Sequence, residues 1–175
     1  MRKLFIVSIA LCLLATADRL TAQQPEVKPG PEHMKLKESE GTWDATIKSK
    51  DGDSKGTFMF KLDLNGLWLM EHFKADFGGM AFEGRGATSY DPTKKKYVSV
   101  WIDSMSTSPM ISEGTYDAAK KTMTMKGDMP MPDGKNMKVT LTTVDNDANN
   151  KTFTIHGDDK GDFEILRITY KRRAK

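Results

Sequence analysis

The chain has 175 residues and a formal net charge of +3, and 38% of its residues are hydrophobic. This length allows one domain with a sizeable core, and so small a charge argues against a protein that binds nucleic acid or an anionic membrane through a basic surface. Cys12 is the only cysteine, which excludes an intramolecular disulfide.

Residues 1–22 have the three parts of a secretory signal peptide. Arg2 and Lys3 precede an apolar run over residues 4–14, and small residues follow it. That run is too short for a helix that spans a bilayer. Removing residues 1–22 takes away three of 27 cations and one of 24 anions, which leaves a net charge of +1. We therefore expect an exported protein, periplasmic or extracellular, with no integral membrane segment in its mature form.

Two cleavage points fit the small-residue rule, one after Ala17 and one after Ala22. We favour Ala22, because it leaves no arginine beside the cleaved bond and makes the polar Gln23 the first residue. A lipid anchor on Cys12 is the rival interpretation, but Leu11 stands where a small residue should precede a lipidated cysteine.

The mature chain is expected to start with a linker over residues 23–31, which has three prolines and no apolar period. Pro31 suits the first turn of a short helix, which would run to about residue 38. One domain then follows over residues 32–175.

From Gly41 onward, every apolar run alternates with polar residues at a period of two, which is typical of strands. Asn65-Gly66 predicts a tight hairpin. A Tyr-Asp turn occurs twice, at Tyr90-Asp91 and Tyr116-Asp117, and each copy joins two such runs. About ten strands at this spacing predict an all-β protein, either an antiparallel up-and-down barrel or a β-sandwich.

The alternation also predicts which side chains face inward. Glu71 shares a face with Leu69 and Phe73, so it is a carboxylate on the predicted core face. Trp101 and Asp103 lie opposite an aliphatic face, and we favour the aliphatic face as the inward one. The alternative turns the aromatic face into a cavity, where a few polar groups would orient an apolar ligand. The ligand-binding candidates are Glu71, Phe73, Trp101 and Asp103.

Metal and haem binding receive little support from the sequence, which predicts no cofactor. His33, His72 and His156 are not at metal-ligand spacing. Haem ligation by His156 is a minor alternative. A second one is Cu(I) held by thioethers of the methionines that cluster at positions 123, 125, 129 and 131. Methionines that alternate with threonines are also ordinary core residues.

Catalysis is the less favoured interpretation. The predicted mature chain has no cysteine, and the sequence has no Gly-x-Ser-x-Gly motif. The alternative to a binding protein is a hydrolase- or isomerase-type enzyme in which an inward cluster of Glu71, Asp103 and Glu113 acts as general acid or base. We favour an exported barrel that binds a small, largely apolar molecule without catalysis.

Several motifs together resemble a bacterial family of unknown function, number 1579. They include Gly41-Thr42-Trp43-Asp44, Trp101-Ile102-Asp103-Ser104-Met105 and Ser112-Glu113-Gly114-Thr115-Tyr116-Asp117. The resemblance implies a barrel similar to the calycins, such as lipocalins and nitrobindins, over residues 29–172. It also implies that a basic residue of the last strand, here Arg172, lies over Trp43. The family implies no activity.

Overall fold

The computed structural model describes residues 27–49, 52–157 and 163–174, without the side chain of Ser49. The predicted signal peptide and residues 23–26 of the predicted linker lie outside these residues.

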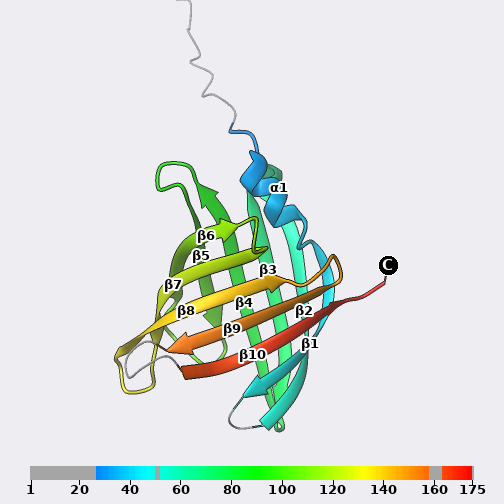
Figure 1. The fold of residues 1–175 in the computed structure, drawn as a ribbon. Helices are drawn as coiled ribbons and strands as arrows, with labels where there is room; N and C mark the ends of the chain where they lie inside the picture. Colours follow the sequence, from blue (N-terminus) through cyan, green and yellow to red (C-terminus); the bar gives the residue numbers. More distant parts are fainter. Residues whose placement is uncertain (1–26, 50–51, 158–162, 175) are drawn as a thin grey trace, which may run out of the picture.

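Ten antiparallel strands form one closed barrel (Figure 1). Each strand pairs with the next in sequence, and β1 pairs with β10 to close the sheet, with Trp43 opposite Arg172. This confirms the predicted up-and-down barrel and excludes the sandwich. The strands are β1 (Gly41–Ser49), β2 (Gly52–Asp63), β3 (Trp68–Phe77), β4 (Met80–Asp91), β5 (Lys96–Asp103), β6 (Met110–Asp117), β7 (Thr122–Pro130), β8 (Asn136–Asp145), β9 (Asn150–Gly157) and β10 (Phe163–Arg172).

The predicted helix forms as α1 (Pro31–Lys37) and lies across one end of the barrel (Figure 1). Pro31 occupies the first helical turn, where its missing N–H costs nothing. Leu36 and His33 are the buried side chains of this helix. The Tyr97 hydroxyl of β5 donates to the Glu32 carbonyl of the helix at 3.2 Å. These contacts make α1 the cover of this end, which we call the closed end.

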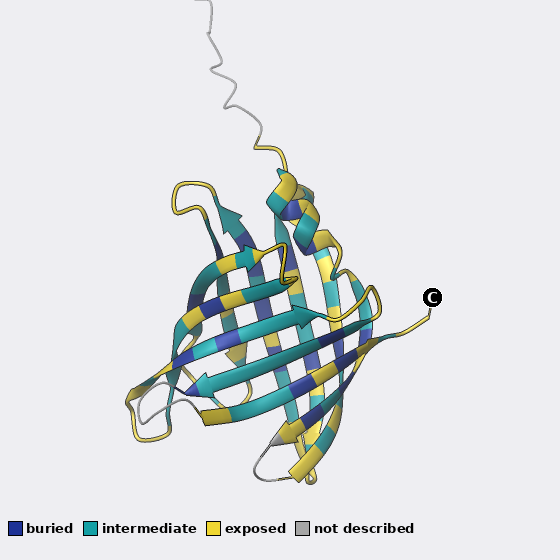
Figure 2. Ribbon diagram, viewed as in Figure 1, coloured by how far each residue is buried: buried dark blue, intermediate teal, exposed yellow. Residues whose placement is uncertain are grey.

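Buried residues alternate with less buried ones along parts of several strands (Figure 2). Trp43, Ala45 and Ile47, which lie on one face of β1, are at most 2% exposed. Phe58 of β2 and Phe73 of β3 pack against them. Inward side chains are therefore set by the period of two, as expected for a barrel.

Strand β5 departs from the prediction, because its aromatic face and not its aliphatic face points inward. Tyr97 is 4% exposed, whereas Val100 and Ile102 are 40% and 53% exposed. The indole of Trp101 lies so close to Gly84 of β4 that a Cβ there would come within 2.2 Å of the ring. The preference for an inward aliphatic face was wrong, because the neighbouring strand leaves room for a large flat ring on the other side.

Arg172 covers Trp43 at the seam of the barrel. Its guanidinium carbon lies 4.1 Å from the centroid of the Trp43 ring, and its nitrogens donate to the carbonyls of Glu38, Glu40 and Ala148. The Trp43 indole N–H donates to the Ser39 carbonyl at 2.9 Å. The position of Arg172 over Trp43 is the one that the resemblance implied. The pair also ties the last strand to the segment between α1 and β1.

Candidate functional site

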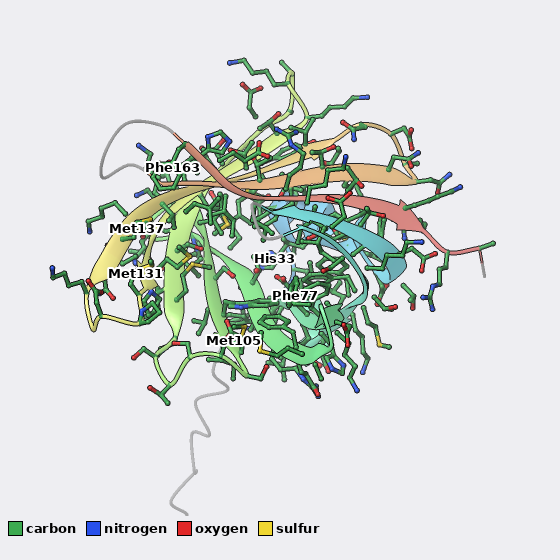
Figure 3. The ribbon with its side chains drawn as sticks, turned by 90° about the horizontal axis from the view of Figure 1, so that it is seen from below. His33, Phe77, Met105, Met131, Met137 and Phe163 are labelled. Atoms are coloured by element: carbon green, nitrogen blue, oxygen red, sulfur yellow. The ribbon has the colours of Figure 1, made fainter. Side chains whose placement is uncertain are left out.

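The barrel encloses a cavity of about 860 Å³ that runs from the closed end to the opposite end. Phe77, Met105 and Met131 lie around the opening when the barrel is seen from that opposite end (Figure 3). The turn and loop residues of this rim follow β3, β5 and β7. The cavity therefore extends to the end that α1 does not cover.

Two kinds of apolar wall line the cavity. One is aromatic, and Phe58 in it stacks between Phe60 and Phe73, with ring centroids 4.7 Å apart on each side. The other consists of methionines, whose flexible side chains fill irregular space. The aromatic wall has Phe58, Phe60, Phe73, Phe82, Trp101 and Tyr170, and the methionine wall has Met110, Met123, Met125, Met129 and Met131.

Glu71 is the anchor of a polar row on the aromatic side. The Thr88 hydroxyl donates to Glu71 Oε1 at 2.7 Å, and the Thr88 and Ser99 oxygens are 3.0 Å apart. One hydroxyl has one proton to give, so Ser99 donates to Thr88 when Thr88 donates to an ionised Glu71. Gly86 makes room for the carboxyl, since a Cβ there would lie 3.1 Å from it.

Glu71 is partly exposed and lines the cavity. Burial raises the pKa of Glu71 to about 7, although the hydrogen bond from Thr88 acts in the opposite direction. Burial and the nearby Glu71 charge also raise the pKa of Tyr170 above its usual value. Near neutral pH, much of Glu71 is therefore protonated and able to donate as well as accept a hydrogen bond.

A second polar group lies at the closed end. Asp145 of β8 accepts hydrogen bonds from Lys35 of α1 and pairs with Lys151 of β9, with both N–O distances at 2.7 Å. Lys151 also donates to the Ser39 hydroxyl at 2.9 Å, and the Tyr116 hydroxyl donates to Asp145 at 3.3 Å. All five line the cavity.

The four predicted ligand-binding residues all line the cavity, namely Glu71, Phe73, Trp101 and Asp103. Asp103 lies toward the rim and accepts the Trp101 indole N–H at 3.0 Å. Glu113 is elsewhere, on the outer surface, where it pairs with Lys94 and Lys96 at 3.1 and 2.7 Å. The predicted cluster of three inward carboxylates is therefore wrong, because alternation in β6 turns Glu113 outward.

None of the three histidines lines the cavity, where a histidine that coordinates a bound haem or metal would have to lie. His33 accepts a hydrogen bond from the Gly30 N–H at 3.0 Å, and His72 bonds to Glu83 at 2.8 Å. His156 lies on the outer face near Glu164, opposite its cavity-lining neighbour Ile155. Within the described residues, no three His, Cys, Asp or Glu side chains gather where they could hold a metal.

Sequence reasoning missed the partners of Glu71 and the whole closed-end group. Thr88 and Ser99 are cross-strand neighbours, which only the register reveals. The inward position of Lys151 could have been predicted from the sequence, since alternation places it on the face of Phe153 and Ile155.

The described chain is thus a closed, ten-stranded antiparallel barrel with an apolar interior cavity and a helix across one end. The chain belongs to the family described as "Protein of unknown function (DUF1579)", whose model matches residues 28–172. No protein of curated function matches it significantly. In the part of the chain that the structure describes, no helix is long and apolar enough to cross a membrane.

Two solved structures show the same fold at low identity. Rv2717c from M. tuberculosis is 10% identical with a TM-score of 0.60, over 83% of this chain and 99% of that one. The S-type phycobiliprotein lyase CPES from Guillardia theta is 8% identical with a TM-score of 0.54, over 84% of this chain and 99% of that one.

Proposed function

We propose that this protein binds one small, largely apolar molecule inside the barrel and releases it unchanged. The cavity of about 860 Å³ carries this proposal, because small-molecule sites measure about 300–1,000 Å³ and combine apolar walls with a few polar groups. Aromatic rings on one wall suit a flat or ring-bearing ligand, and the methionines opposite adapt to its outline.

The polar row would orient this ligand. Glu71, Thr88 and Ser99 form a hydrogen-bonded chain on an otherwise apolar wall, and the ring of Tyr170 also lines the cavity. A ligand hydroxyl or amine at this depth would exchange hydrogen bonds with Glu71. A ligand without such a group would leave Thr88 as the hydrogen-bond partner of one Glu71 oxygen and give the other oxygen none, at a cost of about 1–3 kcal/mol.

We expect Trp101 fluorescence to report ligand binding directly. Addition of the neutral dye N-phenyl-1-naphthylamine should quench Trp101, because its indole lines the cavity. Trp101→Phe should remove most of the quenching. The matched control is Trp68→Phe, since Trp68 precedes the inward Leu69 and faces outward. Quenching that survives Trp101→Phe and disappears in Trp68→Phe would place the dye outside the barrel.

Catalysis by Glu71 is the second candidate, supported by the pKa of about 7 that suits a general acid or base. Native mass spectrometry followed by extraction of the copurified molecule separates the two. Recovery of one intact compound supports binding, whereas a Glu71-dependent change in the mass of the compound supports catalysis.

We also propose that the protein is exported and loses residues 1–22. The intact mass of the processed protein tests this, with Gln23 expected as its first residue. A mass that retains residues 1–22, or that includes acyl chains, contradicts the proposal.

A further inference from the structure

The polar residues at the closed end carry an inference about the chemistry of the ligand. We call Lys35, Ser39, Tyr116, Asp145 and Lys151 the closed-end cluster. Each of them lines the cavity, and the Lys35, Lys151 and Asp145 side chains are only 18%, 9% and 15% exposed. The cluster is therefore the polar floor of an apolar cavity.

Positive charge exceeds negative charge in this floor. Two lysine ammonium groups share the single carboxylate of Asp145. The other carboxylate near Lys35 is Glu38, whose side chain is 64% exposed to solvent. A third cation, Arg172, lies close enough to act electrostatically on Lys151. The floor thus keeps about one positive charge that no buried carboxylate balances.

The attachment of α1 to the barrel explains the position of Lys35 but not that of Lys151. The Lys35–Asp145 pair already joins the helix to β8 across the end of the barrel. Lys151 adds a second buried cation, and burial lowers its pKa below the usual value although Asp145 opposes this. An incompletely balanced buried charge is costly, so an incoming anion would relieve this cost.

Lys151 also has the hydrogen-bonding capacity for such an anion. Its ammonium group has three N–H donors, of which Asp145 and Ser39 account for two. The indole of Trp43 lies 5.5 Å from the nitrogen and orders the side chain by a cation–π contact. One donor remains for an acceptor in the cavity.

We propose that the closed-end cluster is the subsite for a single anionic group of an amphiphilic ligand, whose apolar body lies along the aromatic and methionine walls. This inference rests on the proposed binding function. The ligand enters with its anionic end first, pairs with Lys151 and Lys35, and places its middle beside Glu71. The ligand class is an apolar monoanion, such as a carboxylic acid with an aliphatic or ring-bearing body.

Two fluorescent dyes with the same skeleton test the charge preference. The dye 8-anilinonaphthalene-1-sulfonate carries one negative charge, and N-phenyl-1-naphthylamine lacks it. Wild-type protein should bind the sulfonate about tenfold more tightly than the neutral dye. Lys151→Met should abolish this preference, because affinity for the sulfonate should fall to that for the neutral dye. Lys151→Gln, which keeps a donor for Asp145, should do the same.

A substitution of opposite sign separates an anion site from a purely structural network. Asp145→Asn removes the only buried carboxylate of the cluster, so it should increase affinity for the sulfonate by several-fold, about 1 kcal/mol. Lys138→Met and Asp128→Asn are matched controls, because this pair lies 2.6 Å apart on the outer surface, and neither should change the preference.

The results distinguish three cases. Opposite effects of Lys151→Met and Asp145→Asn on sulfonate binding support the anionic subsite. Neutral and anionic dyes of equal affinity, or loss of sulfonate binding in both variants, overturn it and leave the binding function intact. If neither dye binds in the cavity, the proposed function itself fails and the subsite fails with it.

Discussion

Glu71→Gln is expected to make the folded protein about 3 kcal/mol more stable than wild type at pH 8 and to leave its stability unchanged at pH 4. The substitution keeps the shape of the side chain and removes its charge. Burial raises the pKa of Glu71 from 4.5 to about 7. Below pH 4.5 the carboxyl is protonated in both folded and unfolded chains, so the variant and the wild type differ little.

The sign follows from proton binding. Between pH 4.5 and 7 the folded chain keeps the Glu71 proton that the unfolded chain has lost, so wild-type stability falls as pH rises through this window. Above pH 7 both chains carry the charge, and the folded chain bears the full cost of burying it. Urea unfolding of both proteins from pH 4 to pH 8.5 measures the difference in midpoint and slope.

Glu83→Gln is the control with the opposite sign. Hydrogen bonds from Arg85 and His72 lower the pKa of Glu83 on the outer surface. The contribution of Glu83 to stability is therefore present above its unfolded pKa and is lost as pH falls. Glu83→Gln should lower the free energy of unfolding at neutral pH only. Parallel pH profiles for wild type and Glu71→Gln would show that Glu71 is solvated like a surface carboxylate.

Trp43→Ala is expected to destabilise the protein by about 3–5 kcal/mol, the usual range for removing a large buried aromatic side chain. Trp43 is 0% exposed, and its ring packs in the core of β1, β2, β3 and β10. The substitution removes this packing and also leaves the Arg172 guanidinium without the ring beneath it. Trp68→Ala, on the outer face of β3, should cost much less.

Arg172→Ala should cost less than Trp43→Ala, and the two losses should not add. The guanidinium and the indole are in contact, so either substitution removes the shared interaction. A double-mutant cycle in urea measures the coupling. Additive losses would show that Arg172 acts only through its hydrogen bonds to Glu38, Glu40 and Ala148.

The inward faces of most strands could be predicted from the sequence, because a side chain in a strand alternates strictly between the two sides of the sheet. Glu71 and Phe73 were placed inward for this reason, and both line the cavity. The same rule predicted about ten strands, whereas Pro31 at a first turn predicted the helix before them. It could not choose between the two faces of β5, where both carry large side chains.

Strand register decided that choice. Gly84 and Gly86 lie in β4 opposite Asp103 and Trp101, and two glycines leave a flat space that only a ring fills. The sequence shows these glycines but not which strand residue faces them. Because Trp101 faces inward over these glycines, its neighbours Val100 and Ile102 face outward and are exposed.

The sequence by itself determined the ten strands, the short helix and the inward position of Glu71, since these depend on local periodicity and turn residues. Only the tertiary structure decided that the interior is a cavity, that Glu71 bonds to Thr88, and that Lys35, Asp145 and Lys151 meet. Lys35 and Asp145 are separated by 110 residues, and only closure of the barrel brings them together. Contacts of this kind depend on closure and register, which no local pattern in the sequence contains.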